Sequence, residues 1–256
     1  QFDSASGHKM NKLLNKIKYF YKKYLSSEDK NNNTIEYPSY GSIELMSKWY
    51  DTQTYFQSKQ WMENRELTNL RPSFKTLVNK KNIVGLEIGV GKGLNSLNIF
   101  NNLDIAKLYL VDVADPPGEP GVSLVQDPKV KFVKIDSLEF LQTFDEKLDF
   151  VYLDGSHEFY HVLNELPLAY NKLKIGGILS GHDYEQFGVM AAVQTFYFNL
   201  WHYKKLKPNE IKFAPCLDNH PGYPKEYLEC GFPVDWWLEK SFEIDKDFEM
   251  KLLRNG

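Results

Sequence analysis

The chain has 256 residues, of which 42% are hydrophobic and 25% charged, enough for one large α/β domain with its own core. Its 31 Lys and Arg against 34 Asp and Glu give a net charge of −3, and no apolar run is long enough to span a bilayer. This composition argues against a nucleic-acid partner, a membrane span and, with only Cys216 and Cys230, a disulfide-built scaffold, so we expect a cytoplasmic protein.

The first part of the chain is predicted to be distinct from the rest. Residues 1–9 resemble a cloning remnant. Residues 10–80 are predicted to form an N-terminal helical region, because apolar residues recur at helical spacing in Met10–Tyr24 and the aromatic-rich stretch from Ser42 to Glu66 has no clean strand period. This region can cap a site or pack as core. Its basic helix at Met10–Tyr24 is interpreted as a solvated helix that packs one apolar stripe, and contact with a membrane surface or a partner is the alternative. Its apolar surface also leaves self-association open, for instance as a homodimer.

Residues 81–256 are predicted to form a Rossmann-like α/β domain, because short apolar runs alternate with helical stretches. The runs are Ile83–Ile88, Leu108–Val111, Val130–Ile135, Phe150–Leu153 and Gly177–Ser180. An acidic residue ends or follows each run: Glu87, Asp112, Asp136, Asp154 and Asp183. Units of this length form a parallel sheet with right-handed crossovers, and such sheets bind ligands at the carboxyl ends of their strands.

A glycine-rich turn follows the first predicted strand. Gly89, Gly91 and Gly93 lack Cβ atoms, so the backbone can turn tightly and approach a ligand, and the next helix points its amides at the same place. The turn fits a dinucleotide as well as S-adenosylmethionine. Glu87 favours the latter, because a carboxylate there would repel a pyrophosphate but would pair with a cationic amino group.

Two further strand ends are predicted to bind the nucleoside. Asp112 ends the second strand, where a carboxylate can accept hydrogen bonds from both ribose hydroxyls. Asp136 and Ser137 end the third strand and are placed for the adenine edge, although residues of these types also cap helices.

An Asp-x-x-His motif and a His-Asp pair follow the next two strands. Parallel packing would bring Asp154, His182 and Asp183 to one rim, and this ligand set suits Mg²⁺ or Mn²⁺. His157 is a candidate general base for a hydroxyl group that the metal activates. Alternatively, His157 caps the following helix or bonds a backbone carbonyl, and His182 is a buried structural histidine.

The stretch from Glu87 to Phe196 resembles the class I S-adenosylmethionine-dependent methyltransferases. The segments DGSHEFYHVLNEL, LKIGGILSGHDY and GVMAAVQTF are similar to methyltransferase family 24, to which the macrocin- and mycinamicin-type sugar O-methyltransferases are related. The resemblance implies a seven-stranded, mostly parallel sheet with helices on both faces. It also implies a metal held by Asp154 and the step His182-Asp183, and His157 as the base; several relatives have two acids at that step, so His182 departs from their pattern.

The resemblance implies a metal-dependent O-methyltransferase acting on a sugar hydroxyl, with a free or nucleotide-linked sugar, for a surface polysaccharide or natural-product glycan. A catechol-like or macrolide hydroxyl is the alternative acceptor. A nicotinamide-dependent oxidoreductase and a non-catalytic binding module remain further alternatives. The segments His220–Pro224 and Trp236-Trp237 can line a sugar pocket, or they can form an ordered loop and a final strand in the core.

Overall fold

The computed structural model describes residues 70–118, 121–184, 186–203, 208–209, 211–215, 234–245 and 248. All of them belong to the second of two units of the chain, residues 64–256. The predicted remnant at 1–9, the predicted helical region up to residue 69, both cysteines and the segment His220–Pro224 lie outside the described residues.

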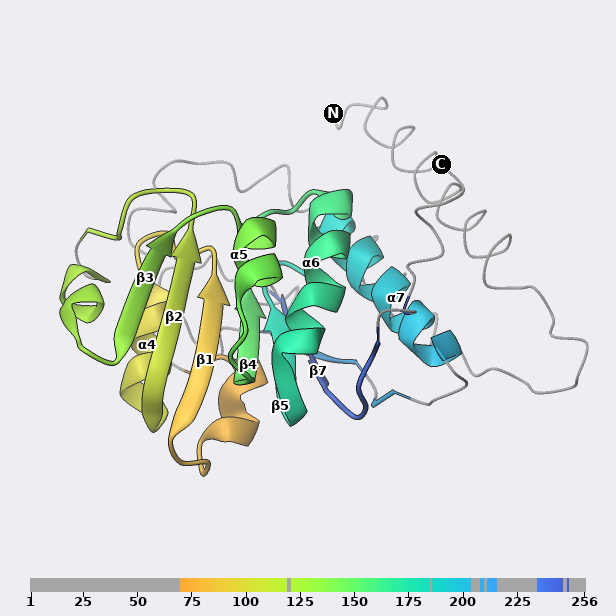
Figure 1. The fold of residues 1–256 in the computed structure, drawn as a ribbon, viewed down its shortest axis with the longest axis horizontal. Helices are drawn as coiled ribbons and strands as arrows, with labels where there is room; N and C mark the ends of the chain where they lie inside the picture. The colour runs from red at the N-terminus through yellow and green to blue at the C-terminus, as the bar shows by residue number, and fades with distance from the viewer. Residues whose placement is uncertain are drawn as a thin grey trace, which may run out of the picture. The chain divides into compact units, whose positions relative to one another are not determined.

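The described residues form one sheet of seven strands in the order β3-β2-β1-β4-β5-β7-β6 (Figure 1). The strands are β1 (Ile83–Ile88), β2 (Ile105–Asp112), β3 (Val130–Lys134), β4 (Leu148–Leu153), β5 (Leu173–Gly181), β6 (Lys212–Pro215) and β7 (Val234–Glu239). The pairs from β3 to β5 are parallel, and β7 runs antiparallel to both of its neighbours. The strand order reverses between β1 and β4, where sheets of this type bind ligands.

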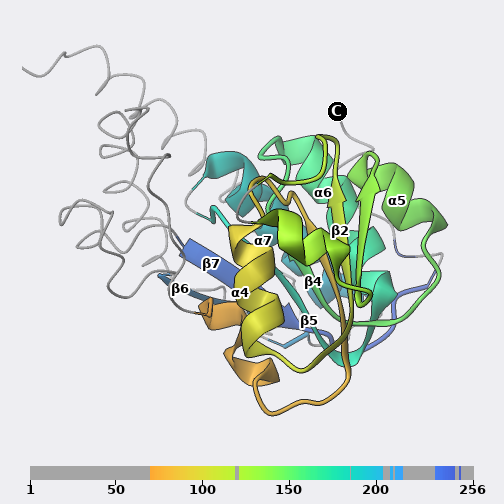
Figure 2. The same cartoon turned by 90° about the vertical axis from the view of Figure 1, so that its left-hand side faces the viewer.

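Helices cover both faces of the sheet, as expected. They are η2 (Pro72–Leu77), α4 (Leu94–Asn102), η3 (Gly121–Gln126), α5 (Ser137–Thr143), α6 (Phe159–Lys172) and α7 (Phe187–His202). Helices α5 and α6 lie on one face, with α7 packed beside α6, while α4 and η2 lie on the other (Figures 1 and 2). The prediction of a Rossmann-like, mostly parallel sheet with helices on both faces is confirmed.

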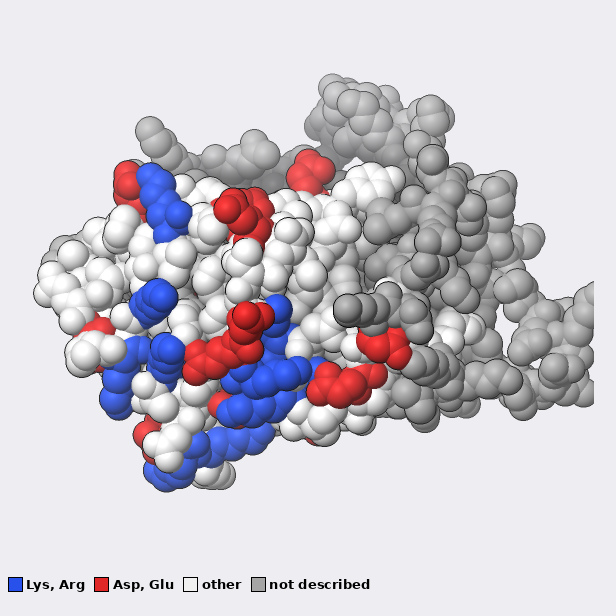
Figure 3. Space-filling view, in the orientation of Figure 1, with Lys and Arg blue, Asp and Glu red and all other residues white. Residues whose placement is uncertain are grey.

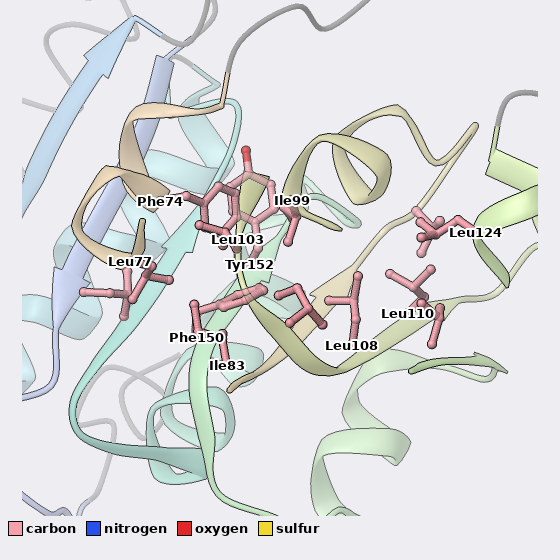
Figure 4. Packing of buried hydrophobic residues seen from close by; sticks show 14 residues of the cluster. Phe74, Leu77, Ile83, Ile99, Leu103, Leu108, Leu110, Leu124, Phe150 and Tyr152 are labelled. Atoms are coloured by element: carbon pink, nitrogen blue, oxygen red, sulfur yellow. The ribbon is translucent and has the colours of Figure 1, made fainter. Parts of the chain in front are cut away.

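The core beneath the glycine turn includes a segment that precedes the predicted domain boundary at residue 80. Phe74 of η2 is fully buried, with its ring centroid 5.1 Å from those of Phe150 and Tyr152 on β4 (Figure 4). Gly85 makes room for this packing, because a Cβ atom there would lie 2.1 Å from the Phe150 ring. The short helix η2 is therefore part of the α/β unit.

The segment Trp236-Trp237 lies in β7, and Trp236 is only 1% exposed. Of the two interpretations of this segment, the structure shows the final strand packed in the core. Edge strand β6 and its partner β7 carry no motif of their own, and only the resemblance to class I methyltransferases predicted a sheet of seven strands.

The face that carries α5 and α6 has mixed charge, with basic and acidic side chains interspersed (Figure 3). Lys107 pairs with Glu146 at 2.9 Å, and Lys174 pairs with Asp149 at 2.9 Å. Exposed pairs of this kind contribute little to stability. Among the described helices, none has the length and apolar character that crossing a membrane requires.

Candidate functional site

The glycine turn has the conformation that its residues predict. Gly89, Gly91 and Gly93 all have positive φ, at 83°, 52° and 74°. A Cβ atom on Gly89 would lie 2.1 Å from the backbone oxygen of Asp154, so the turn lies directly against the end of β4. This places the predicted cofactor turn next to the first predicted metal ligand.

Asp112 supports this turn through its carboxylate. Its Oδ2 accepts hydrogen bonds from the backbone N–H groups of Val90 and Gly91, at 2.8 and 3.1 Å, and its Oδ1 accepts one from Ala114 at 2.9 Å. A carboxylate has about four lone-pair sites, so Asp112 retains capacity for a further donor. Its predicted bonds to the ribose remain a prediction.

Glu87 is turned into the protein and is only 1% exposed. Its Oε1 accepts a hydrogen bond from Asn95 Nδ2 at 2.9 Å, and its Oε2 accepts one from Ser96 Oγ. Burial raises the pKa of Glu87 from 4.5 to about 7, against the hydrogen bonds from Ser96 and Asn95, which lower it. Glu87 therefore joins β1 to α4, and its predicted pairing with the amino group of the cofactor is untested.

Asp136 is the N-cap of α5. Its Oδ1 accepts hydrogen bonds from the backbone N–H groups of Leu138 and Glu139, at 2.9 and 3.2 Å, so the capping role is present. Ser137 Oγ lies 2.9 Å from Nε2 of His161, a partner that no sequence motif indicated. The assignment of Asp136 and Ser137 to the adenine edge stays a prediction.

The structure brings together Asp154, His182 and Asp183, as the sequence predicted. One ligand atom from each lies within 4.8 Å of the others. Nδ1 of His182 is 3.4 Å from Oδ1 of Asp154 and 3.2 Å from Oδ2 of Asp183. The cause is topological: β4 and β5 are adjacent and parallel, with Leu153 opposite Gly181, so the residues that follow both strands meet at one edge.

His157 also belongs to this cluster. Its Nε2 lies 2.9 Å from Oδ2 of Asp183, and the side chain is 41% exposed. The hydrogen bond with Asp183 raises the pKa of His157. Glu158 is the N-cap of α6, so His157 is not in the capping position that was its alternative role.

The electrostatics of Asp183 favour an ionised carboxylate. Burial acts to raise its pKa, but the charges and hydrogen bonds of His182 and His157 hold it well below the usual range. Asp183 also has a positive φ of 55°, which a non-glycine residue rarely adopts. Such backbone strain concentrates at functional sites.

The donor set fits a divalent cation. Two carboxylates and one imidazole, completed by water or substrate oxygens, suit Mg²⁺ or Mn²⁺. Because His182 is only 4% exposed, the cluster has a buried side and a side open to ligand at His157. The site can therefore bind a cation and present an imidazole beside it.

Two buried residues near the cluster were not predicted as site residues, because no sequence motif indicates them. Arg71, at the N-cap of η2, lies 3.8 Å from Oδ2 of Asp154, and Asp235 of β7 pairs with Arg71 at 3.2 Å. Both are buried, at 3% and 0% exposure. Arg71 falls in the region interpreted as a cap, and Asp235 precedes a tryptophan pair in a segment without motifs, so neither was a candidate.

Part of the chain is similar to a family of known proteins. Residues 86–184 match the model of methyltransferase family 24, described as a methyltransferase domain. The matched stretch contains the glycine turn, the three residues of the candidate metal cluster and His157. No curated protein sequence matches the chain.

The chain is also similar to solved structures. A protein from Clostridium thermocellum described as an rRNA methylase has 14% identity and a TM-score of 0.50, over 70% of this chain and 100% of that one. A spermidine synthase bound to the transition-state analogue AdoDATO has 18% identity and a TM-score of 0.49, over 73% and 64%. The MycE methyltransferase of the mycinamycin pathway, bound to Mg and SAH, has 18% identity and a TM-score of 0.45, over 68% and 50%.

At these identities the structural likeness shows the fold alone, a Rossmann-like α/β sheet with helices on both faces. The family match supports a methyltransferase. Neither comparison identifies the acceptor, the atom that is methylated or a metal.

Proposed function

We propose that this chain is an S-adenosylmethionine-dependent O-methyltransferase that uses a divalent cation to activate a sugar hydroxyl. The observation that carries the proposal is the contact between the two halves of the site. Gly89 of the cofactor turn packs so closely on the backbone of Asp154 that no Cβ atom fits between them. An electrophilic methyl group on the turn would thus lie near a hydroxyl group at the Asp154, His182 and Asp183 cluster.

Each residue has a distinct task in this proposal. Asp154, His182 and Asp183 would hold the cation, which lowers the pKa of a ligated hydroxyl group by several units when bound, as it does for water. His157 accepts the hydroxyl proton at Nε2 while the acceptor oxygen bonds to the methyl carbon. S-adenosylmethionine, when bound, would supply the methyl group, and its sulfur would retain the electron pair of the carbon–sulfur bond, so the products would be a methyl ether and S-adenosylhomocysteine.

Adjacent hydroxyl groups, as on a sugar or a catechol, can chelate one cation and fix the orientation of the reacting oxygen. The sequence similarity to methyltransferase family 24 favours the sugar. A free or nucleotide-linked sugar fits equally well, and a catechol-like or macrolide hydroxyl is the second candidate. The net charge of −3 disfavours an RNA acceptor.

Calorimetry and methyl transfer together test the proposal. The purified chain, stripped with a chelator, is titrated with S-adenosylmethionine and then assayed for transfer of a labelled methyl group to sugars, nucleotide sugars and catechols. We expect cofactor binding without metal, and transfer only after Mg²⁺ or Mn²⁺ is restored. Failure to bind S-adenosylmethionine, or binding of NAD in its place, would refute the proposal.

The matched control for these assays is Lys107→Ala. This residue pairs with Glu146 at the surface and is 42% exposed, and its strand β2 lies outside the metal cluster. The variant is expected to bind cofactor and metal as the parent does. In the parent, methyl transfer to catechols and not to sugars would show that the acceptor is a catechol-like hydroxyl group, the second candidate.

A further inference from the structure

Arg71 is a buried cation that contacts three different elements around the site. Its Nε donates a hydrogen bond to Oδ1 of Asn95 on α4 at 2.8 Å, and its Nη1 donates one to Oδ1 of Asp235 on β7 at 3.2 Å. The remaining nitrogen, Nη2, lies 3.8 Å from Oδ2 of Asp154. Each nitrogen of the guanidinium therefore faces a different partner.

Further contacts around Asp235 and Tyr152 hold the guanidinium group of Arg71 in place. Asp235, which is fully buried, also accepts hydrogen bonds from Ser73 Oγ at 3.0 Å and from Tyr152 Oη at 2.8 Å. Arg71 lies over the Tyr152 ring, with Cζ 5.4 Å from the ring centroid. A planar group fixed by this many contacts has a defined orientation, which the flexible ammonium of lysine cannot reproduce.

The two carboxylate oxygens of Asp154 face different partners. Oδ2 lies towards Arg71, whereas Oδ1 lies 3.4 Å from Nδ1 of His182, inside the candidate metal cluster. A cation on one oxygen and a metal site beside the other would fix the rotation of the carboxylate. Orienting partners of this kind behind metal ligands commonly affect metal affinity.

We propose that Arg71, held by Asp235, positions Asp154 so that it binds the metal through Oδ1 alone. Arg71 is a positioning residue: it acts on the metal through Asp154. The inference rests on the metal site of the proposed function. It adds a role for two residues that lie 164 positions apart in the chain and outside the stretch that matches the methyltransferase model.

The test measures Mn²⁺ binding by calorimetry and by electron paramagnetic resonance in the full chain. Arg71→Lys keeps the charge but loses the planar guanidinium with its several N–H donors. The double variant Arg71→Met with Asp235→Asn removes both buried charges together, so that neither is left unpaired in the folded chain. Circular dichroism checks that each variant is folded. We expect Mn²⁺ affinity to fall by roughly 10-fold or more in both, with an altered Mn²⁺ spectrum.

Lys240→Met is the matched control. Lys240 is fully buried, and its Nζ donates a hydrogen bond to the backbone oxygen of Leu173 at 2.9 Å, at the opposite end of β5 from the metal cluster. It is expected to lower stability without changing Mn²⁺ affinity.

Three results would overturn the inference. If folded Arg71 variants bind Mn²⁺ with the parent's affinity and spectrum, Arg71 has no positioning role. The proposed metal site would be unaffected by that result. An equal loss of Mn²⁺ affinity in Lys240→Met would mean that general destabilisation is the cause. A parent that binds S-adenosylmethionine but no Mn²⁺ would remove the metal site itself.

Discussion

Oδ2 of Asp183 lies 2.9 Å from Nε2 of His157 and 3.2 Å from Nδ1 of His182, so a single carboxylate oxygen connects both histidines of the site. This oxygen is shared between the candidate base and the candidate metal cluster. A cation bound there would compete with His157 for Asp183, which would leave the imidazole available to a substrate proton. The proposed chemistry thus depends on contacts that the two histidines make with one acid.

His157→Gln is expected to separate catalysis from binding. Removing a general base lowers the rate by roughly 10²- to 10⁴-fold, while Asp154, His182 and Asp183 keep their places. Methyl transfer should fall in this range, and S-adenosylmethionine and Mn²⁺ should bind as in the parent. A variant with the full rate of transfer would assign the base to another group.

Asp183→Asn is expected to abolish tight Mn²⁺ binding. The substitution removes the ionised oxygen that faces both histidines but keeps the size of the side chain. Calorimetry with Mn²⁺ measures the loss, and S-adenosylmethionine affinity serves as the internal control. Undiminished Mn²⁺ binding would place the metal elsewhere.

Gly89→Ala and Gly91→Ala form a matched pair at the cofactor turn. Both glycines have positive φ, but a new Cβ atom at Gly89 meets the Asp154 backbone at 2.1 Å, whereas nothing lies within 4 Å at Gly91. Gly91→Ala should lower the free energy of unfolding by about 1–2 kcal/mol, the cost of a left-handed backbone conformation for a residue with a Cβ atom. Gly89→Ala should lower the free energy of unfolding further and weaken both cofactor and metal binding. Urea unfolding and calorimetry compare them, and equal effects would contradict the close packing of Gly89 on Asp154.

Gly188→Ala tests whether α7 positions the loop that carries His157. A Cβ atom at Gly188 would lie 2.0 Å from the backbone oxygen of His157, so the loop or the helix must move. We expect slower methyl transfer with unchanged S-adenosylmethionine binding, because the atoms nearest to a Cβ on Gly188 belong to His157 and Phe159 and not to the glycine turn. Kinetics of transfer at saturating cofactor provide the measurement, and an unchanged rate would show that the loop adapts without loss.

Glu87 should make stability depend on pH. Burial raises its pKa to about 7 in the folded chain from 4.5, so the folded state binds the extra proton between these values. Stability should therefore fall as pH rises from about 5 to 7, by up to about 3 kcal/mol from this group. Glu87→Gln should flatten that slope. Urea unfolding of both proteins at several pH values measures it, and parallel slopes would contradict the raised pKa.

Local signals in the amino-acid sequence were sufficient for the five parallel strands and for the grouping of Asp154, His182 and Asp183. Short apolar runs predicted β1 to β5, and because parallel strands end at one edge, the acids and histidines after β4 and β5 had to meet there. The glycine turn was equally local, since its left-handed backbone follows from Gly89, Gly91 and Gly93 themselves. These features depend on neighbours in the chain or on a rule of sheet geometry.

The contacts of Arg71, Asp235 and Glu87 with other segments could not be predicted from the sequence. Arg71 meets Asp235 only because β7 pairs with β5 and η2 packs beneath β4, and no periodicity in either segment indicates the partner. Glu87 is similar: its position was predictable, but its burial against Asn95 and Ser96 depends on how α4 packs on β1. Hydrogen bonds between segments far apart in sequence are determined by packing, so the tertiary structure alone assigns these side chains their partners.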